Sequence, residues 1–251
     1  MMRRMIKPVA TVGLEAKPKE GKGHSMSKVV IFGDSHWASL AHFYLEQDSP
    51  HEVAAFTVNG DHLRREKFLG LPVTPFEETQ DRYPPDDFQM FLPISFKRMN
   101  HLRAEKYEEA KQKGYRLISY VSSRAFTWPG FTCGDNCFIL EGNTIMPFVE
   151  IGNDVVMFCS NHVGHHTVIK DHVTITSHVV IAGVCTIESH CFLGVNATVR
   201  DETIIARETL VGAAVGILED TAEFEVYKAH SPGPSGIRSD QLRSMSHKTK
   251  G

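Results

Sequence analysis

The sequence predicts an α/β domain of Rossmann-like type followed by a parallel β-helix. Two patterns carry this prediction: strand and helix signals alternate over residues 28–121, and a sixfold apolar repeat covers residues 139–217. With 251 residues, of which 41% are hydrophobic, the chain can bury two cores. The predicted divisions are a disordered leader or extension (1–25), the α/β domain (26–126), the β-helix (127–222) and a C-terminal segment with a mobile tail (223–251).

The α/β domain is expected to begin with a buried strand at residues 29–32, which a Gly-Asp-Ser sequence ends before a helix. Further strands are predicted at 53–58, 88–92 and 117–121, and a second helix over 100–112. Strands separated by helices indicate a small parallel sheet. The first helix is expected to present one apolar face, made by Trp37, Leu40, Phe43 and Tyr44.

The second half of the chain repeats every six residues. A second column follows four residues after the first, and eleven of its thirteen members are small or β-branched. A β-helix directs one bulky and one small side chain inward from each short strand, whereas a β-sandwich requires no such columns. Three strands close a coil of about eighteen residues, which gives between four and five coils. The first column is large and apolar throughout: Ile139, Ile145, Ile151, Met157, Val163, Ile169, Ile175, Ile181, Ile187, Leu193, Val199, Ile205, Val211 and Ile217.

The five cysteines fit this repeat. Cys133 and Cys137 continue the two inward columns backwards, and Cys185 and Cys191 belong to the small column, so core packing accounts for all four. A zinc site at the first pair is therefore disfavoured. Cys159 lies off both columns and is expected to be exposed. An odd number of cysteines without an export signal favours a reduced, cytoplasmic location.

Charge and hydropathy argue against two kinds of partner. The formal net charge is −3, but basic residues gather at the two ends of the chain, which leaves 16 basic against 27 acidic residues over positions 29–236. This acidic body argues against nucleic acid, because phosphate binding requires a basic face. No run approaches 18 consecutive apolar residues, so membrane insertion is not expected.

Three segments carry a resemblance to a known family: VVIFGDS at 29–35, VGHHTVI at 163–169 and CFLGVNA at 191–197. Together with the sixfold repeat, they make residues 27–230 resemble the hexapeptide-repeat acyltransferases. The resemblance is closest to the sugar acetyltransferases grouped with the sialic acid O-acetyltransferase family, including the bacillosamine-type nucleotide-amino-sugar N-acetyltransferases. It implies a left-handed β-helix, a homotrimer, and acetyl-CoA as co-substrate in the groove between neighbouring β-helices.

The resemblance also implies a catalytic histidine. His165 has the position of the family's general base, a role that suits a side chain titrating near neutral pH. The residue after it is His166, where relatives carry an acidic partner. A carboxylate would orient the imidazole and stabilise its protonated form, and His166 can supply only the first of these by a hydrogen bond. We treat His165 as the base and His166 as its candidate partner.

The acetyl-CoA site is expected further along the β-helix. Gly183 follows the predicted base by eighteen residues, which is one coil, so Ala182 and Gly183 are placed to offer a backbone amide to the thioester carbonyl. In the family this is the place of the oxyanion donor. Gly212 and Ala213 are expected along the pantetheine arm, and Lys228 at the phosphates of CoA.

The N-terminal domain is expected to hold the acceptor. A strand that enters a tight turn before a helix presents backbone amides and a helix N-terminus to a diphosphate. Lys97 and Arg98 either pair with phosphate or form a solvated helix start. The candidate substrate-binding residues are Gly33, Asp34, Ser35 and Asn59.

We therefore predict an acetyl-CoA-dependent sugar acetyltransferase of surface-glycan synthesis, such as lipopolysaccharide or capsule, acting on the amine of a nucleotide-linked sugar. Sugar O-acetylation is the first alternative. The others are a metalloenzyme of the gamma-carbonic-anhydrase type and a β-helix that binds a glycan without catalysis. No two histidines of the repeat lie five residues apart, the spacing those metalloenzymes use, and only His172 and His190 are expected to stack, about 4.8 Å apart on adjacent coils. No metal is expected.

Overall fold

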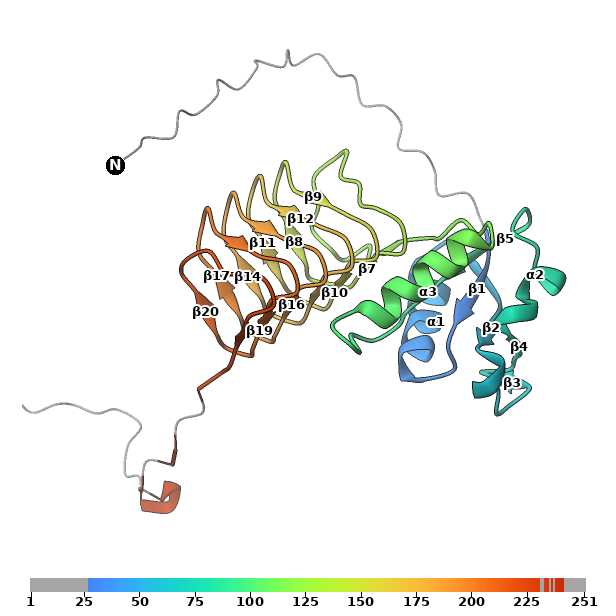
Figure 1. The fold of residues 1–251 in the computed structure, drawn as a ribbon, viewed down its shortest axis with the longest axis horizontal. Coiled ribbons are helices and arrows are strands. Elements are labelled where there is room, and N and C mark those ends of the chain that lie inside the picture. The colour runs from blue at the N-terminus through green and yellow to red at the C-terminus, as the bar shows by residue number, and fades with distance from the viewer. Residues whose placement is uncertain (1–26, 231–232, 235, 237, 242–251) are drawn as a thin grey trace, which may run out of the picture.

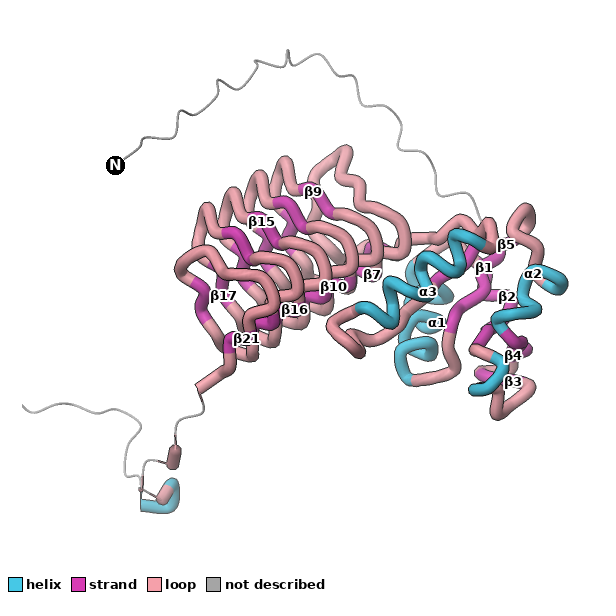
Figure 2. The backbone as a smooth tube through the Cα atoms, viewed as in Figure 1, coloured by secondary structure: helices cyan, strands magenta, loops and turns pink. Residues whose placement is uncertain are grey.

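The computed structural model describes residues 27–230, 233–234, 236 and 238–241. It contains an α/β domain beside the first coils of a three-sided parallel β-helix (Figure 1), and short strands joined by corners make up most of the β-helix (Figure 2). Among the described residues, no helix is both long and apolar enough to cross a bilayer.

The α/β domain is built on a five-stranded sheet of order β3-β4-β2-β1-β5, in which only the β3–β4 pair is antiparallel. Helix α1 packs on one face of this sheet and helix α3 on the other, each over its own apolar cluster. The elements are β1 (Lys28–Phe32), α1 (His36–Asp48), β2 (Glu52–Val58), β3 (Lys67–Phe68), β4 (Leu71–Pro75), α2 (Thr79–Arg82), β5 (Phe88–Phe91) and α3 (His101–Gln112), with short 3₁₀ turns at Gly60–His62 and Phe76–Glu78.

The structure corrects two expectations for this domain and adds one strand that was not predicted. Residues 117–121 do not form a fourth sheet strand: Leu117 makes a single bridge to Met90, and β6 (Tyr120–Val121) pairs with the β-helix instead. The sheet is completed by β4, whose two prolines argue against a strand in sequence and are tolerated near the sheet edge. Phe43 is exposed and does not share the buried face of α1.

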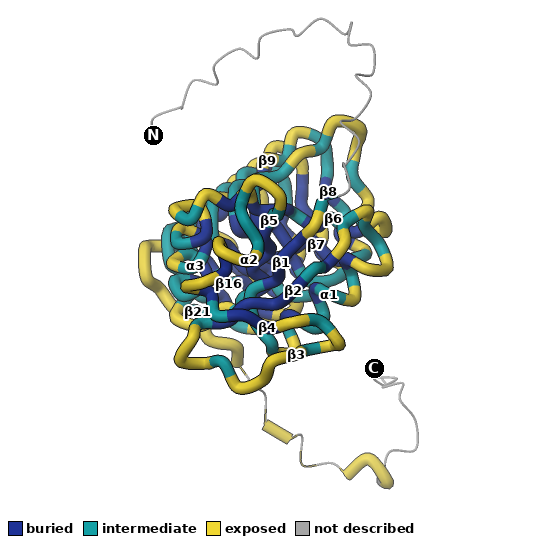
Figure 3. Tube along the Cα trace, turned by 90° about the vertical axis from the view of Figure 1, so that its right-hand side faces the viewer, coloured by how far each residue is buried: buried dark blue, intermediate teal, exposed yellow. Residues whose placement is uncertain are grey.

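The β-helix strands stack with an eighteen-residue register in three sheets. Both predicted columns point inward, and the large column forms one continuous core with the small residues between its members. Figure 3 shows this interior in dark blue beside the buried α/β sheet. The strands are β7 (Phe138–Ile139), β8 (Thr144–Ile145), β9 (Glu150–Ile151), β10 (Val156–Met157), β11 (His162–Val163), β12 (Val168–Ile169), β13 (Thr174–Ile175), β14 (Val180–Ile181), β15 (Thr186–Ile187), β16 (Phe192–Leu193), β17 (Thr198–Val199), β18 (Ile204–Ile205), β19 (Leu210–Val211), β20 (Gly216–Ile217) and β21 (Val226–Tyr227); a 3₁₀ turn follows at Ser239–Gln241.

Each turn of the β-helix has three corners, and at every corner one residue adopts a left-handed conformation with positive φ. Three columns of such residues run along the molecule, and we name each by what lies against it. The open corner comprises Phe148, His166, Val184 and Glu202; the α3 corner comprises Asn136, Asp154, His172, His190 and Glu208; the α1 corner comprises Gly142, Ser160, His178, Asn196 and Ala214.

The α/β domain covers one face of the β-helix. Helix α3 bonds to the α3 corner, where Arg103 reaches Asp154, and helix α1 reaches the α1 corner, where the Tyr44 hydroxyl donates to Glu141 at 2.7 Å. Phe138 and Val156, on the sheet between those corners, are buried against α1. The open corner is the vertex opposite this covered face, and its Phe148 is 72% exposed.

The cysteines follow the repeat as predicted. Cys137, Cys185 and Cys191 are buried in the β-helix core, and Cys133 packs against it. Cys159 is partly buried against α1 instead of fully exposed, because the α/β domain covers this corner. Burial and the nearby Glu141 carboxylate raise the pKa of the Cys159 thiol to about 11, so it is an unreactive thiol at neutral pH.

Candidate active site

His165 lies at the open corner with its ring directly over the next coil. A Cβ placed on Gly183 would come within 2.9 Å of both Cε1 and Nε2 of the His165 ring, so only a glycine leaves room for it there. The side chain is exposed instead of buried in the β-helix interior. The structure therefore brings together the predicted base and the predicted amide donor at an accessible surface.

His166 contacts this ring from the side. The Nδ1 atoms of the two histidines are 3.1 Å apart and their planes are nearly perpendicular, at 85°. On its other side His166 packs against Phe148, with ring centroids 4.6 Å apart. Because Nδ1 of His165 is engaged, its Nε2 over Gly183 is the nitrogen available to a substrate.

The backbone below His165 is tightly stacked. A Cβ on Gly164 would lie 2.5 Å from the backbone of Ala182 and Gly183, which is impossible without moving the coil. The amide of Ala182 is used, since it donates to Val199 at 3.0 Å. The Gly183 amide makes no hydrogen bond among the described residues, and the carbonyl of that residue accepts from Glu202. An unpaired amide beside an imidazole is the donor that an oxyanion requires.

The other predicted acetyl-CoA residues lie elsewhere. Gly212 and Ala213 precede Ala214 at the α1 corner, not the open corner, so one chain does not align them with His165. They do meet Lys228: the Gly212 amide donates to Tyr227 at 2.8 Å, and a Cβ on Gly212 would touch Ala229. The reason is arithmetic, since 30 residues separate Gly183 from Ala213, which is not a whole number of coils.

All four candidate substrate-binding residues line one cavity of about 380 Å³ at the carboxyl ends of β1, β2 and β5. Gly33 makes the turn there with φ 109°, and its amide donates to Thr57 at 2.7 Å. The Oδ1 atom of Asn59 is buried without a hydrogen-bond partner in the described part of the chain. Ligands of open α/β sheets bind at this edge.

The cavity also contains residues that the sequence did not single out. Lys106 of α3 and His62 line it, and so does the segment 93–95 that follows β5. Only tertiary packing places α3 here, so no local signal could have found Lys106. Of the two basic residues left open, Lys97 lines the cavity, whereas Arg98 pairs with Glu105 at 2.7 Å on the exposed face of α3.

The cavity and His165 of one chain lie on opposite sides of the β-helix. The cavity belongs to the α/β domain, whose helices contact the α3 and α1 corners. His165 lies at the open corner, the third vertex. One chain therefore carries both halves of the predicted site without joining them.

Comparison with solved structures identifies the architecture; no family model matches the sequence. The acetyltransferase domain of PglB from Neisseria gonorrhoeae superposes with TM-score 0.69 at 16% identity, covering 80% of this chain and 96% of that one, and it is also known in complex with acetyl coenzyme A. This chain has the left-handed β-helix fold of that acetyltransferase.

Two more solved structures share this acetyltransferase fold. A mutant of perosamine N-acetyltransferase from Caulobacter crescentus, in complex with CoA and GDP-perosamine, gives TM-score 0.62 at 21% identity over 81% of this chain and 94% of that one. WeeI from Acinetobacter baumannii gives 0.64 at 18% identity over the same shares. The matches span both domains, so the pairing of an α/β unit with the β-helix recurs.

The histidines of the α3 corner do not converge on a common point. The ring centroids of His172 and His190 are 4.8 Å apart, the separation that the spacing predicts, but the rings are tilted by 44° instead of stacked. Within the described ranges, no group of three or more His, Cys, Asp and Glu side chains is arranged to hold a metal ion.

Proposed function

We propose that the protein is an acetyl-CoA-dependent acetyltransferase that acts on the amine of a nucleotide-linked amino sugar. The observation that carries this proposal is the His165 ring over the unpaired Gly183 amide. The fold supports it, because PglB is solved with acetyl-CoA and perosamine N-acetyltransferase with CoA and a GDP-sugar. Synthesis of a surface glycan, in the cytoplasm, is the setting that we propose.

In this proposal His165 is the general base. In the tautomer that carries its proton on Nδ1, His165 donates to Nδ1 of His166 across their 3.1 Å contact. This tautomer leaves a lone pair on Nε2 to take the proton from the acceptor amine as that nitrogen attacks the thioester carbonyl. The Gly183 amide donates to the carbonyl oxygen as negative charge develops there. As the carbon–sulfur bond breaks, the proton held on Nε2 of His165 passes to the sulfur, and CoA leaves as the thiol. A neutral His166 orients the base as a carboxylate would, without adding a charge of its own.

The acceptor binds, in this proposal, in the cavity of the α/β domain. Lys97 and Lys106 supply positive charge for a diphosphate, and the turn at Gly33 offers backbone amides. The unpaired Oδ1 of Asn59 can accept a hydrogen bond from the nucleotide. O-acetylation of a sugar is the second candidate function, because the same base serves a hydroxyl.

We further propose a homotrimer in which one chain's cavity faces another chain's open corner. Its support is the separation of the two halves within one chain and the apolar surface of the open corner, where Phe148 is 72% and Val184 49% exposed. A groove between β-helices would also bring Gly212, Ala213 and Lys228 of one chain beside the base of another. Exposed apolar patches of this kind mark interfaces.

The deciding experiment measures free thiol released from acetyl-CoA across a panel of UDP-, dTDP- and GDP-linked amino sugars, with the matching hydroxyl sugars as controls. Thiol release with one amino sugar supports N-acetylation. Release only with hydroxyl sugars supports the second candidate, and a protein that binds these sugars without releasing thiol is a non-catalytic β-helix. Light scattering with the same preparation gives the oligomeric state.

A further inference from the structure

Helix α3 belongs to two parts of the molecule at once. On one side Leu102 and Lys106 line the α/β cavity. On the other, Asn100, His101 and Arg103 face the α3 corner of the β-helix. Any movement of α3 relative to this corner therefore moves a wall of the cavity. The contacts that hold α3 against the β-helix thus affect the cavity as well as the stability of the fold.

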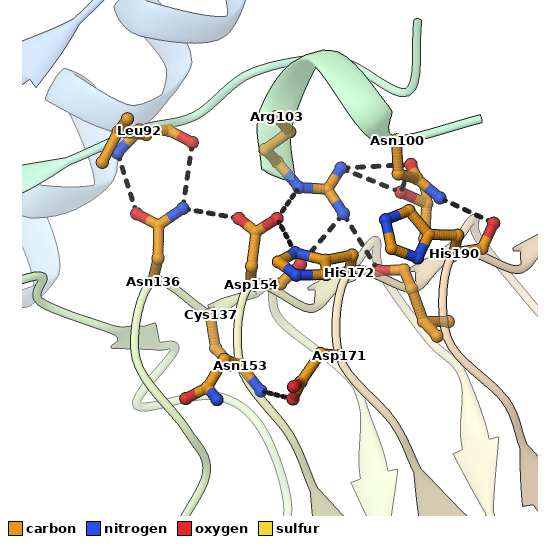
Figure 4. A network of polar contacts seen from close by, with 12 residues as sticks. Leu92, Asn100, Arg103, Asn136, Cys137, Asn153, Asp154, Asp171, His172 and His190 are labelled. Atoms are coloured by element: carbon orange, nitrogen blue, oxygen red, sulfur yellow. Dashed lines mark hydrogen bonds and ion pairs between the residues drawn. The ribbon is translucent and has the colours of Figure 1, made fainter. Parts of the chain in front are cut away.

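A buried ion pair is the first of the contacts that hold α3 against the β-helix (Figure 4). Arg103 and Asp154 are 1% and 0% exposed, and Nε of the arginine lies 2.9 Å from the carboxylate. Asp154 also accepts from Asn136 at 2.7 Å, and Asn136 holds both the amide and the carbonyl of Leu92. The segment that Leu92 begins runs directly into the cavity wall.

A row of three packed imidazoles forms the second group of these contacts. His190 lies between His101 of α3, at 4.4 Å between ring centroids, and His172 of the preceding coil, at 4.8 Å. Each of the two outer rings contacts a carboxylate. Nε2 of His101 lies 3.2 Å from Oε2 of Glu208, and Nδ1 of His172 lies 2.8 Å from Oδ2 of Asp154. The middle ring has no carboxylate of its own, although Glu208 of the next coil attracts it weakly.

Most of the groups that face His190 disfavour its protonation. His101 and Arg103 from α3 and His172 from the β-helix act in this direction, and only the carboxylate of Glu208 favours the protonated ring. Asp154 lies beyond His172 and is already paired with Arg103. Burial, followed by the two neighbouring imidazoles, lowers the pKa of His190 to about 4. At neutral pH the middle ring is therefore uncharged while α3 is in place.

We propose that His190 is a positioning residue that seats α3, and with it the acceptor cavity, on the β-helix only while its ring is neutral, so that mild acid loosens acceptor binding. The proposal rests on the proposed function for the meaning of the cavity. When α3 lifts away, His190 enters solvent and titrates near 6.5. Acid therefore favours the lifted state as pH falls from about 6.5 towards 4.

Hydrogen exchange of the α3 amides tests the proposal in the full-length chain. Between pH 7 and pH 5, after correction for intrinsic exchange, protection of residues 104–112 should fall by roughly tenfold to thirtyfold, which is the shift that one proton of this linkage allows. In His190→Phe, which keeps an aromatic ring in the row, this fall should disappear. The matched control is His178→Phe, at the same left-handed position of the α1 corner and exposed, which should behave as the wild type.

Protection that does not depend on pH in the wild type, or a fall that persists in His190→Phe, would overturn the proposal. Should His190→Phe not fold, an NMR titration of the wild-type imidazoles decides, since a His190 that titrates near 6.5 in the folded protein also overturns it. In the enzyme assay the KM of the acceptor should rise between pH 7 and pH 5 more than that of acetyl-CoA. If the protein is inactive in this assay, the proposed function is wrong, but the exchange experiment still tests the role of His190.

Discussion

The open corner and the α3 corner are built from the same repeat, yet they use their histidines in opposite ways. Both place a histidine at a left-handed position, His166 at one and His172 and His190 at the other. At the open corner, no helix of the α/β domain covers the imidazoles, and Gly183 leaves room for the ring of His165. At the α3 corner the two histidines are packed under a helix, and His172 contacts the carboxylate of Asp154.

The difference shows that the hexapeptide scaffold supplies position, and what covers a corner decides its role. Exposure leaves Nε2 of His165 open to the proton transfer that we propose, whereas burial lowers the pKa of His190 and holds it neutral. A corner histidine is therefore not functional by its spacing alone. The predictions that follow probe each corner, beginning with the largest effect.

Breaking the buried pair at the α3 corner should have the largest effect. Arg103→Met leaves the Asp154 carboxylate uncompensated at 0% exposure, which should lower the free energy of unfolding by about 3–5 kcal/mol. Urea unfolding measures it. The matched control is Arg98→Met, which removes an exposed pair with Glu105 from the same region and should cost less than about 1 kcal/mol. Equal losses in the two variants would mean that the pair does not fasten α3.

At the open corner, His165→Ala should reduce acetyl transfer by about 10²–10⁴-fold without lowering the unfolding midpoint, because the ring is exposed and serves as the proposed base. Thiol release from acetyl-CoA with the accepted sugar is the measurement. His162→Ala, an exposed histidine three residues earlier, is the control and should retain activity. Turnover within a few-fold of the wild type would remove His165 from the mechanism.

The contrast between the corners also explains what the sequence could and could not predict. The sequence of residues 139–217 repeats every six positions. The β-helix fold, its inward columns and the contact of His165 with Gly183 can therefore all be predicted by counting residues along the chain. Counting along the chain does not by itself show which corner a residue occupies: Gly212 and Ala213 precede Ala214 at the α1 corner, so within one chain they do not align with His165.

The contacts between the two domains do not repeat along the sequence. No local pattern indicates that Arg103 is buried, because half of the residues of α3 are charged and such a helix is expected to be exposed to solvent. The partner of Arg103, Asp154, lies 51 residues further along the chain. Strand β4 was missed because its prolines oppose a strand by propensity, while pairing with β2 through Phe56 and Val73 overrides them. Long-range packing, not sequence pattern, decided these features.

The fit of the His165 ring over the next coil can be tested with a single methyl group. Gly183→Ala adds a Cβ 2.9 Å from the ring, which must tilt away, and a displaced base should lose between about tenfold and a hundredfold in kcat. Stability should change little because the contacted atoms belong to a mobile side chain. Gly216→Ala, where no atom lies within 4 Å, is the control. Unchanged kcat in Gly183→Ala would show that the ring position over this glycine does not matter.

The α1 side of the domain interface adds a carboxylate to the comparison. Asp48, at the end of α1, accepts hydrogen bonds from Tyr120 at 2.6 Å and from the Ser123 amide at 2.9 Å, where the chain enters the β-helix. Burial alone would raise the pKa of Asp48, but these bonds and one from Ser122 outweigh it and hold the pKa at about 2. The group is partly exposed, so its contribution should be about 1 kcal/mol.

Because the folded pKa lies below the unfolded value, this contribution should be complete above about pH 3.8 and should vanish as pH falls towards 2. Asp48→Asn, compared with the wild type by urea unfolding, should therefore be less stable by about 1 kcal/mol at pH 7 and nearly equal to it near pH 2.5. Acid therefore lowers stability through both groups, but in different ranges: through His190 below about pH 6.5 and through Asp48 only below about pH 3.8. A stability difference for Asp48→Asn that grows on acidification would contradict the assignment.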